Sequence, residues 1–437
     1  MTNQAPHTLK RVVSLPLLVF FILGDVLGAG VYALAGAIAE RAGGAIWAPL
    51  GLGLLFALFT AASYAELVSK YPRAGGAAVF AQRAFGSPML SFLVGFAMLA
   101  AGITSAAGLA LAFAGEYLRV FLDWPAALLA PLFLALIAAL NLRGIKESLG
   151  ANLVMTLVEL SGLVLVMIAV AALCGQGQSE PARLLDFGNQ APGGAILAAA
   201  LLAFYSYVGF ETSANLAEEV KDVRRTYPKA LFMALLIAGL VYLAVGAGAA
   251  LVMPVDRLIA AKAPLMDIVG ASGLGIPRSW FAVIALVAVA NGALLTMIMA
   301  SRLTLGMARE GLLPAVLGRV LPQRRTPAPA IIATTALAAL LTFTGTLEVL
   351  AETVVLLLLF VFLSTNLAVL VLKRDKVEQA HFSIHPLVPV LGILSCLLLL
   401  TQQPAGNWLR AGLLLAAGVA LHALARRYGP RTVAADN

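Results

Sequence analysis

Long apolar runs separated by short polar intervals dominate the pattern along this chain. About 20 apolar residues are needed for a helix to cross the hydrocarbon core of a bilayer. On this measure the pattern predicts an all-α integral membrane protein with twelve transmembrane helices, at about residues 14–39, 44–69, 87–116, 125–142, 148–174, 193–219, 228–253, 279–303, 328–345, 347–372, 386–402 and 406–425. No interval rich in Pro, Gly or Ser divides them, so residues 1–437 are expected to form a single transmembrane domain.

Two of the predicted spans are interrupted near their centres. The first has Asp25 among the glycines of residues 24–30, and the sixth has Gly209 and Glu211 after aromatic residues. An unpaired backbone group in hydrocarbon costs several kcal/mol, so a break is tolerated only where protein, a cavity or a ligand satisfies it. A packing role for Gly24 and Gly28 in helix contact is the alternative reading.

The two interrupted spans occupy corresponding positions in opposite orientations. The first enters from the cytoplasm and the sixth from outside, which predicts inverted repeats at about residues 14–174 and 193–372, with peripheral helices at about 386–425. Paired interrupted helices in inverted halves indicate the binding site of a secondary transporter.

Composition and charge agree with a membrane protein and add an orientation. The chain is 61% hydrophobic and 11% charged, with a mean hydropathy of +0.97 and a net charge of +8. Most basic residues fall in the intervals predicted to be cytoplasmic, and the exceptions are Arg41, Arg119, Arg183, Arg257, Lys262, Arg278 and Arg410. This bias predicts a multi-pass protein of the cell (inner) membrane with both termini cytoplasmic, so the positive charge sets topology and does not indicate nucleic acid.

Enzymatic chemistry finds little support in the residue pattern. Cys174 and Cys396 lack metal-ligand spacing, so neither a metal nor a cofactor is expected. The histidines fall in a tail, a loop or near a span end, at positions His7, His381, His385 and His422. A membrane-embedded transferase, which needs a polar catalytic set, is therefore disfavoured. A channel is the third alternative, and inverted interrupted helices argue against it.

Four segments resemble motifs of the amino acid/polyamine/organocation (APC) superfamily of permeases, in the same order. They are residues 24–32, residues 71–76, residues 207–211 with 218–221 and Pro228, and residues 301–314. The resemblance implies the leucine-transporter-type fold, with five plus five inverted spans and two peripheral ones. It also implies alternating access and an α-amino acid or related amine as substrate. Spans nine to twelve match only in number and hydropathy.

An amino acid zwitterion needs partners for its carboxylate and its ammonium where water is excluded. Free amides at the start of the second half of span one suit the carboxylate, and carbonyls at the breaks suit the ammonium. Family members that take cationic amino acids tend to place a carboxylate in span three, which here is small and apolar, so a neutral side chain is expected. The predicted substrate-binding residues are Asp25, Val26, Gly28, Ala29, Gly30, Val31, Ala101, Thr104, Phe204, Tyr205, Tyr207 and Gly209.

Four acids are predicted at depth in the membrane: Asp25, Glu66, Glu159 and Glu211. A charge at the centre of a membrane helix costs about 2.5–3.5 kcal/mol on insertion scales, so each acid should be paired, protonated or facing water. Glu66 precedes Lys70 by one helical turn, which predicts a solvated ion pair. Glu211 is expected to bond to local backbone.

Glu159 occupies the place where the resemblance implies a lysine in many APC permeases. A carboxylate there could exchange a proton or help to hold a cation, with the remaining predicted coupling residues Gly24, Leu27, Asn291 and Thr296. The hypothesis is a proton-coupled symporter of a neutral amino acid, with Asp25 assisting Glu159. Sodium coupling, uncoupled exchange and transport of a cationic amino acid or polyamine remain alternatives.

Overall fold

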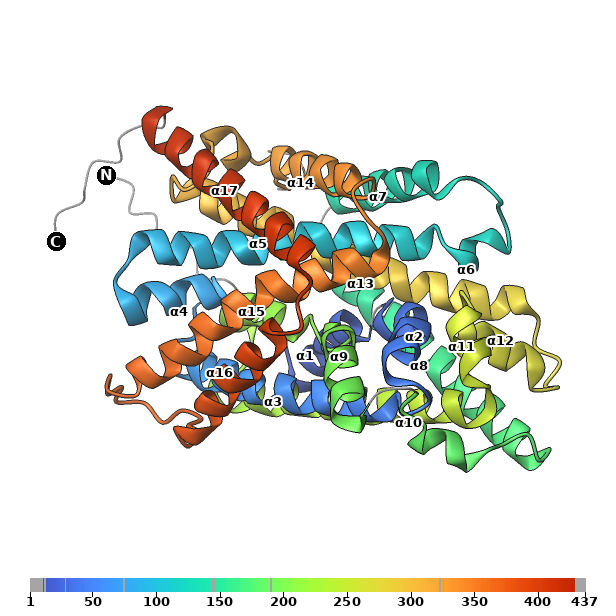
Figure 1. Cartoon of the computed structure of the whole chain (residues 1–437). Helices are drawn as coiled ribbons and strands as arrows, with labels where there is room; N and C mark the ends of the chain where they lie inside the picture. The colour runs from blue at the N-terminus through green and yellow to red at the C-terminus, as the bar shows by residue number, and fades with distance from the viewer. Residues whose placement is uncertain are drawn as a thin grey trace.

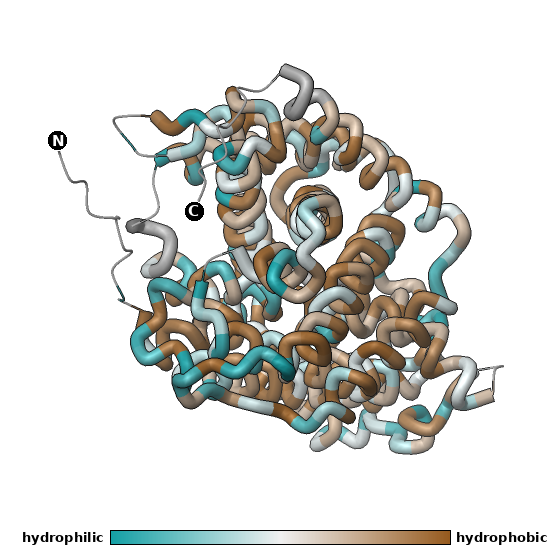
Figure 2. The backbone as a smooth tube through the Cα atoms, turned by 90° about the vertical axis from the view of Figure 1, so that its left-hand side faces the viewer, coloured by the Kyte–Doolittle hydropathy of each residue, from teal (hydrophilic) through white to brown (hydrophobic). Residues whose placement is uncertain are grey.

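Helices make up the regular structure of this protein. The computed structural model describes residues 11, 13–27, 29–73, 75–143, 146–188, 191–321, 324 and 326–428. Across those residues every element is helical, apart from an isolated bridge between Val13 and Val220. Long helices such as α5 and α13 cross the whole body, with α1, α2 and α9 near its middle (Figure 1). Hydrophobic residues follow the helices and hydrophilic residues gather in the connections (Figure 2).

Eight helices of the described chain are long and apolar enough to cross a membrane. They are α3 (Trp47–Lys70), α5 (Pro88–Phe113) continued by α6 (Glu116–Arg119), α7 (Ala126–Arg143), α8 (Lys146–Gly175), α9 (Pro192–Tyr205) continued by the 3-10 helix η2 (Phe210–Glu219), α10 (Val223–Val252), α13 (Arg278–Arg309) and α15 (Leu347–Leu372). The pair α16 (Leu387–Leu400) and α17 (Ala405–Tyr428) bends by 113° and makes nine spans if counted as one. The protein is therefore a multi-pass membrane protein, and the count of twelve spans stays a prediction.

Several shorter helices complete the described chain. The apolar α1 (Leu15–Val26) and α14 (Ala328–Leu341) coincide with predicted spans but are shorter than them. Five others fall in intervals expected to be loops: α4 (Gly76–Phe85), η1 (Pro181–Leu185), α11 (Val255–Ala260), α12 (Pro264–Ala271) and η3 (Ala315–Gly318). The buried Phe80 of α4 packs edge-on against Tyr64 of α3, with ring centroids 6.3 Å apart.

Two helices, α1 and α9, end inside the first and sixth predicted spans. α1 ends at Val26 and α2 (Ala29–Ala42) begins three residues later, while Gly28 lies outside the described residues. α9 ends at Tyr205, and Gly209 then adopts a φ of 127° before η2 begins. That backbone conformation is nearly restricted to glycine, which explains the residue type at this position.

The start of α1 is held beside the end of η2. The Val13 N–H donates to the Glu219 carbonyl at 3.0 Å, and the Lys221 N–H donates to the Val13 carbonyl at 2.9 Å. These two backbone bonds link segments about 200 residues apart in the sequence, and each lies at an end of an interrupted helix.

The predicted ion pair between Glu66 and Lys70 is wrong. Lys373 of the α15 end donates to both Glu66 carboxylate oxygens, at 3.0 and 2.9 Å, and the Ile384 N–H donates to one of them at 2.8 Å. The Lys70 ammonium donates instead to the Leu372 carbonyl at 2.7 Å. The Glu66 side chain is only 3% exposed, so the pair is buried because α15 packs against α3 there.

Candidate functional site

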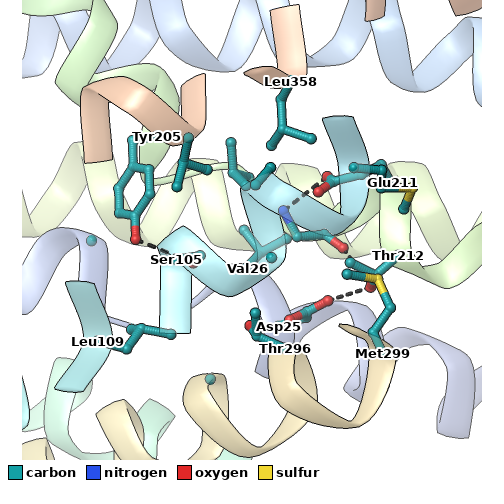
Figure 3. Close-up of a pocket in the computed structure, with 18 of the residues that line it drawn as sticks. Asp25, Val26, Ser105, Leu109, Tyr205, Glu211, Thr212, Thr296, Met299 and Leu358 are labelled. Atoms are coloured by element: carbon teal, nitrogen blue, oxygen red, sulfur yellow. Dashed lines mark hydrogen bonds between the residues drawn. The ribbon is translucent and has the colours of Figure 1, made fainter. Parts of the chain in front are cut away.

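A cavity lies between the two interruptions (Figure 3). One side of it is made by the ends of the broken helices, through Asp25, Val26, Gly30, Tyr205, Ser206, Val208, Gly209, Glu211 and Thr212. The rest of the lining comes from α5, α13 and α15, through Met98, Ala101, Gly102, Ser105, Leu109, Gly292, Thr296, Met299, Val354 and Leu358. The cavity therefore has a polar wall of helix ends and a largely apolar wall of continuous helices.

Glycines allow the two interruptions to touch each other. A Cβ atom on Gly209 would lie 2.7 Å from the Asp25 carbonyl oxygen, and one on Gly30 would lie 2.8 Å from the Ser206 Cα. Real Cβ atoms essentially never approach backbone so closely. Any larger residue at either position would thus separate α1 and α2 from the α9 to η2 connection.

Both acids on the cavity wall accept hydrogen bonds from residues of the second interruption. The Thr212 hydroxyl lies within hydrogen-bond reach of Asp25 Oδ2 and, at 2.8 Å, of the Gly209 carbonyl. The Gly209 N–H donates to Glu211 Oε2 at 2.9 Å, which confirms the expected bond between Glu211 and local backbone. Each carboxylate therefore uses one oxygen to order the second interruption, as the dashed lines in Figure 3 mark.

Two tyrosines add polar contacts around the break in α1 and across the cavity. The Tyr242 hydroxyl donates to the Val26 carbonyl at 2.7 Å. This carbonyl is one of those at the breaks that are expected to bind the substrate ammonium, and one of its two lone pairs is therefore already used. The Tyr205 hydroxyl and Ser105 Oγ lie 3.4 Å apart and connect α9 with α5.

The predicted substrate residues fall into three groups. Those on the cavity wall are Asp25, Val26, Gly30, Ala101, Tyr205 and Gly209. Those that the wall does not include are Thr104, Phe204 and Tyr207, which respectively bond the Ala100 carbonyl, pack on Phe362 and pack on Tyr242. Gly28 lies outside the described residues, and Ala29 and Val31 belong to α2 without a described side chain.

The predicted coupling residues mostly lie behind the cavity. The Asn291 amide nitrogen of α13 lies 3.4 Å from the Gly24 carbonyl oxygen and 3.2 Å from Thr156 Oγ1 of α8. Asn152 and Thr156 also approach Gly24 so closely that no Cβ fits there. Leu27 is buried at the end of α1, whereas Thr296 lines the cavity itself.

Glu159 is fully buried on α8, one turn beyond Thr156. Neither of its carboxylate oxygens has a hydrogen-bond partner among the described residues. Its neighbours are Asn291, Tyr32 and Tyr242, and the Tyr32 hydroxyl donates to the Glu159 backbone carbonyl at 2.8 Å. Asn291 Oδ1 also lacks a partner in this part of the structure. A buried polar atom without a partner is costly, so this pair is an uncommon feature of the described interior.

Sequence reasoning missed a buried carboxylate near the predicted outer ends of the helices. Glu352 of α15 pairs with Arg41 of α2 at 2.5 Å and accepts from the Asn407 amide at 2.9 Å. The Arg41 guanidinium also lies 3.4 Å from the Ala198 carbonyl oxygen of α9. The ion pair and the Arg41 contact therefore connect α2, α9 and α15. In the sequence, the only indication of this pair is an acid within the apolar residues of α15.

Cavity residues missed from the sequence include Ser105 and Thr212. Ser105 lies one residue after the predicted Thr104, so the helical phase of span three decides which of the two faces the cavity. Thr212 follows the second break, where the α-helix has ended and a 3-10 helix has begun. The α-helical periodicity of α9 therefore does not predict the direction of its side chain.

The chain is similar in sequence to known membrane transporters. A sequence profile of the amino acid permease family matches residues 13–408. An uncharacterized transporter of Mycobacterium tuberculosis is 30% identical over 430 residues, covering 97% of this chain and 93% of the relative.

Two further relatives carry substrate names. The branched-chain amino acid permease BcaP of Bacillus subtilis is 27% identical, covering 91% of this chain and 89% of the relative. The vacuolar cationic amino acid transporter 4 of Arabidopsis thaliana is 31% identical, covering 85% of this chain and 64% of the relative. The chain therefore belongs to the amino acid permease family, within the APC superfamily, and it is a membrane transporter rather than an enzyme.

Proposed function

We propose that this protein is a secondary transporter that moves a neutral amino acid across the cytoplasmic membrane by alternating access, coupled to protons. The proposal includes the leucine-transporter-type fold with twelve spans, inverted repeats and both termini in the cytoplasm. The single observation that carries it is the cavity in which both interruptions meet, at Gly30 and Ser206 on one side and Asp25 and Gly209 on the other.

The two walls of the cavity match the two ends of an amino acid. Helix ends leave amides and carbonyls free, and these groups bind a carboxylate and an ammonium without placing a full charge in the pocket. The apolar wall offers methyl, methylene and thioether surface from Met98, Met299 and Leu358. An apolar side chain such as that of leucine or valine suits this lining chemistry, in agreement with the substrate named for the Bacillus relative.

Glu159 is the residue proposed to couple transport to protons. An unpaired carboxylate in a dry interior is costly as an ion, and accepting a proton removes that charge. Its neighbours Asn291 and Tyr32 belong to α13 and to the second half of the broken helix, so a change in proton occupancy at Glu159 would act on both. Asp25 lies on the cavity wall and is proposed to assist.

The test is uptake of labelled leucine by the purified protein in liposomes, with and without an inwardly directed proton gradient. Wild-type protein should accumulate leucine above equilibrium only with the gradient. The Glu159→Gln variant should lose this accumulation but should still exchange external leucine for leucine preloaded inside the liposomes. Glu159 is proposed to couple transport to the proton gradient and not to bind leucine.

A matched control is Glu180→Gln, which removes the same charge from an exposed side chain in the connection between α8 and α9. This variant should behave as wild type in both assays. Gradient-driven accumulation that survives in Glu159→Gln would refute proton coupling at Glu159. Accumulation driven by a sodium gradient instead would support the sodium alternative.

A cationic amino acid or polyamine is the second candidate substrate class. The observation that favours it is the presence of two carboxylates, Asp25 and Glu211, on the cavity wall, together with the name of the Arabidopsis relative. Labelled arginine and spermidine, offered beside leucine in the same liposomes, distinguish the two classes. Uptake of arginine without uptake of leucine would replace the neutral assignment.

A further inference from the structure

A groove runs from the predicted cytoplasmic side between the first turns of α10 and residues 380–382, which connect α15 to α16. Arg224, Arg225 and Lys229 lie among the residues at its polar end. Phe232, Met233 and Leu236 continue it along α10, and Phe382 flanks it with its ring centroid 5.8 Å from that of Phe232. The groove does not include any residue of the cavity between the interruptions.

One exposed stripe of α10 changes from basic to apolar along the groove. Arg225, Lys229, Met233, Leu236 and Leu240 follow one another at three- or four-residue spacing, which places them on one helix face. The three apolar members are 46%, 46% and 67% exposed. The stripe therefore presents cations next to a long apolar surface in the membrane-spanning part of the helix.

The polar end of the groove carries an excess of positive charge. Asp222 is the acid that lines it, against three cations from Arg224, Arg225 and Lys229. The Arg224 Nε donates to the Ser69 carbonyl at 3.2 Å, which fixes the position of the Arg224 guanidinium. Arg224 also lines a second, neighbouring pocket. An occupant of the polar end should thus be an anion.

We propose that this groove binds an anionic phospholipid of the cytoplasmic leaflet. Its phosphate lies between Arg225, Lys229 and the edge of Arg224, and one acyl chain lies over Met233 and Leu236. Basic residues at the cytoplasmic membrane surface attract anionic headgroups. The apolar half of the stripe lies in a membrane-spanning helix, so a free phosphate or a soluble acidic peptide would leave that half unused.

The bound lipid would hold α10 against the connection from α15 to α16. That connection is fastened to α3, because the Phe382 N–H donates to Ser69 Oγ at 3.1 Å and the Ile384 N–H donates to Glu66 at 2.8 Å. The lipid would therefore link α10 to the site where Lys373 and Glu66 join α15 and α3.

The test is native mass spectrometry of the purified full-length protein in detergent, titrated with phosphatidylglycerol or phosphatidylcholine. Each basic residue at an anionic membrane surface contributes about fivefold to binding, so the double variant Arg225→Gln with Lys229→Gln should bind phosphatidylglycerol about 30-fold more weakly. Wild-type protein should retain phosphatidylglycerol in preference to phosphatidylcholine. The matched control is Arg309→Gln with Arg319→Gln, which removes two exposed cations outside the groove and should leave binding unchanged.

A second measurement uses the unaltered chain, which keeps the proposal testable if the double variant fails to fold. Phosphatidylglycerol with a photoreactive acyl chain should crosslink to the α10 segment that contains Met233 and Leu236. Crosslinks confined to other helices would overturn the proposal, as would equal weakening in both double variants. Displacement of the lipid by inorganic phosphate alone would show an anion site without a lipid and would overturn it too.

Discussion

Replacing Gly209 by alanine should destabilise the meeting of the two interruptions. The residue has a φ of 127°, a conformation that costs a non-glycine residue about 1–3 kcal/mol. The new Cβ would also lie 2.7 Å from the Asp25 carbonyl oxygen and 2.9 Å from its carbonyl carbon. Those atoms are backbone, so relief requires α1 to move, and overpacking of this kind costs about 1–3 kcal/mol.

The two costs together amount to about 2–6 kcal/mol, which disfavours this arrangement by at least about 30-fold. Thermal unfolding of the purified Gly209→Ala variant in detergent should therefore occur several degrees below that of the wild type. Initial rates of leucine uptake in liposomes should fall as well, because the cavity wall includes Gly209.

Gly306→Ala is the matched control. Gly306 lies inside α13, and a Cβ there would meet nothing within 4 Å. Alanine in a helix interior gains about 0.5–1 kcal/mol over glycine, so this variant should melt at or above the wild-type temperature. If Gly209→Ala and Gly306→Ala unfold and transport alike, the reasoning from backbone conformation and close approach is wrong.

Two ion pairs give further predictions. Glu352→Gln keeps the contact to Asn407 but leaves the partly exposed Arg41 without its anion, so it should cost about 1–3 kcal/mol and lower the unfolding temperature at pH 7. Asp375 accepts from the Tyr71 hydroxyl at 2.6 Å and from Arg83 at 3.0 Å, and these bonds hold the pKa of Asp375 below its usual value of 3.8. Its contribution to stability is present above about pH 4 and is lost as the pH falls through the lowered pKa. The unfolding temperatures of Asp375→Asn and wild type should thus differ at pH 7 and converge in acid.

The predictions for Glu352→Gln and Asp375→Asn can each be contradicted by the measured unfolding temperatures. An unchanged unfolding temperature for Glu352→Gln would mean that solvent already replaces the anion at the exposed edge of Arg41. A gap between Asp375→Asn and wild type that stays constant into acid would show that the carboxylate charge is not what stabilises the contact.

The hydropathy pattern predicts where most long helices run, and the glycines predict where two of them break. These features are local, because a span needs only enough consecutive apolar residues and a break needs only residues that tolerate irregular backbone. Four of the predicted substrate-binding residues, Asp25, Gly30, Tyr205 and Gly209, lie on the cavity wall, and their role in binding stays a prediction.

Partners distant in the sequence were out of reach of the same reasoning. Glu66 has a lysine four residues away but binds Lys373, which is 307 residues away. Likewise Glu352 finds Arg41 across 311 residues. Helical spacing identifies neighbours on one helix, whereas the choice of a partner on another helix depends on packing that no local pattern records. The same limit applies to Thr212, whose side chain turns toward Asp25 only because the backbone leaves the helix before it.

The backbone bridge between Val13 and Val220 ties the first half of one broken helix to the second half of the other. In the proposed alternating-access cycle, a movement of α1 would therefore also displace the end of η2. A label attached to either segment would report the motion of both. Cutting the chain just after Val13 would leave α1 without this backbone link to the end of η2.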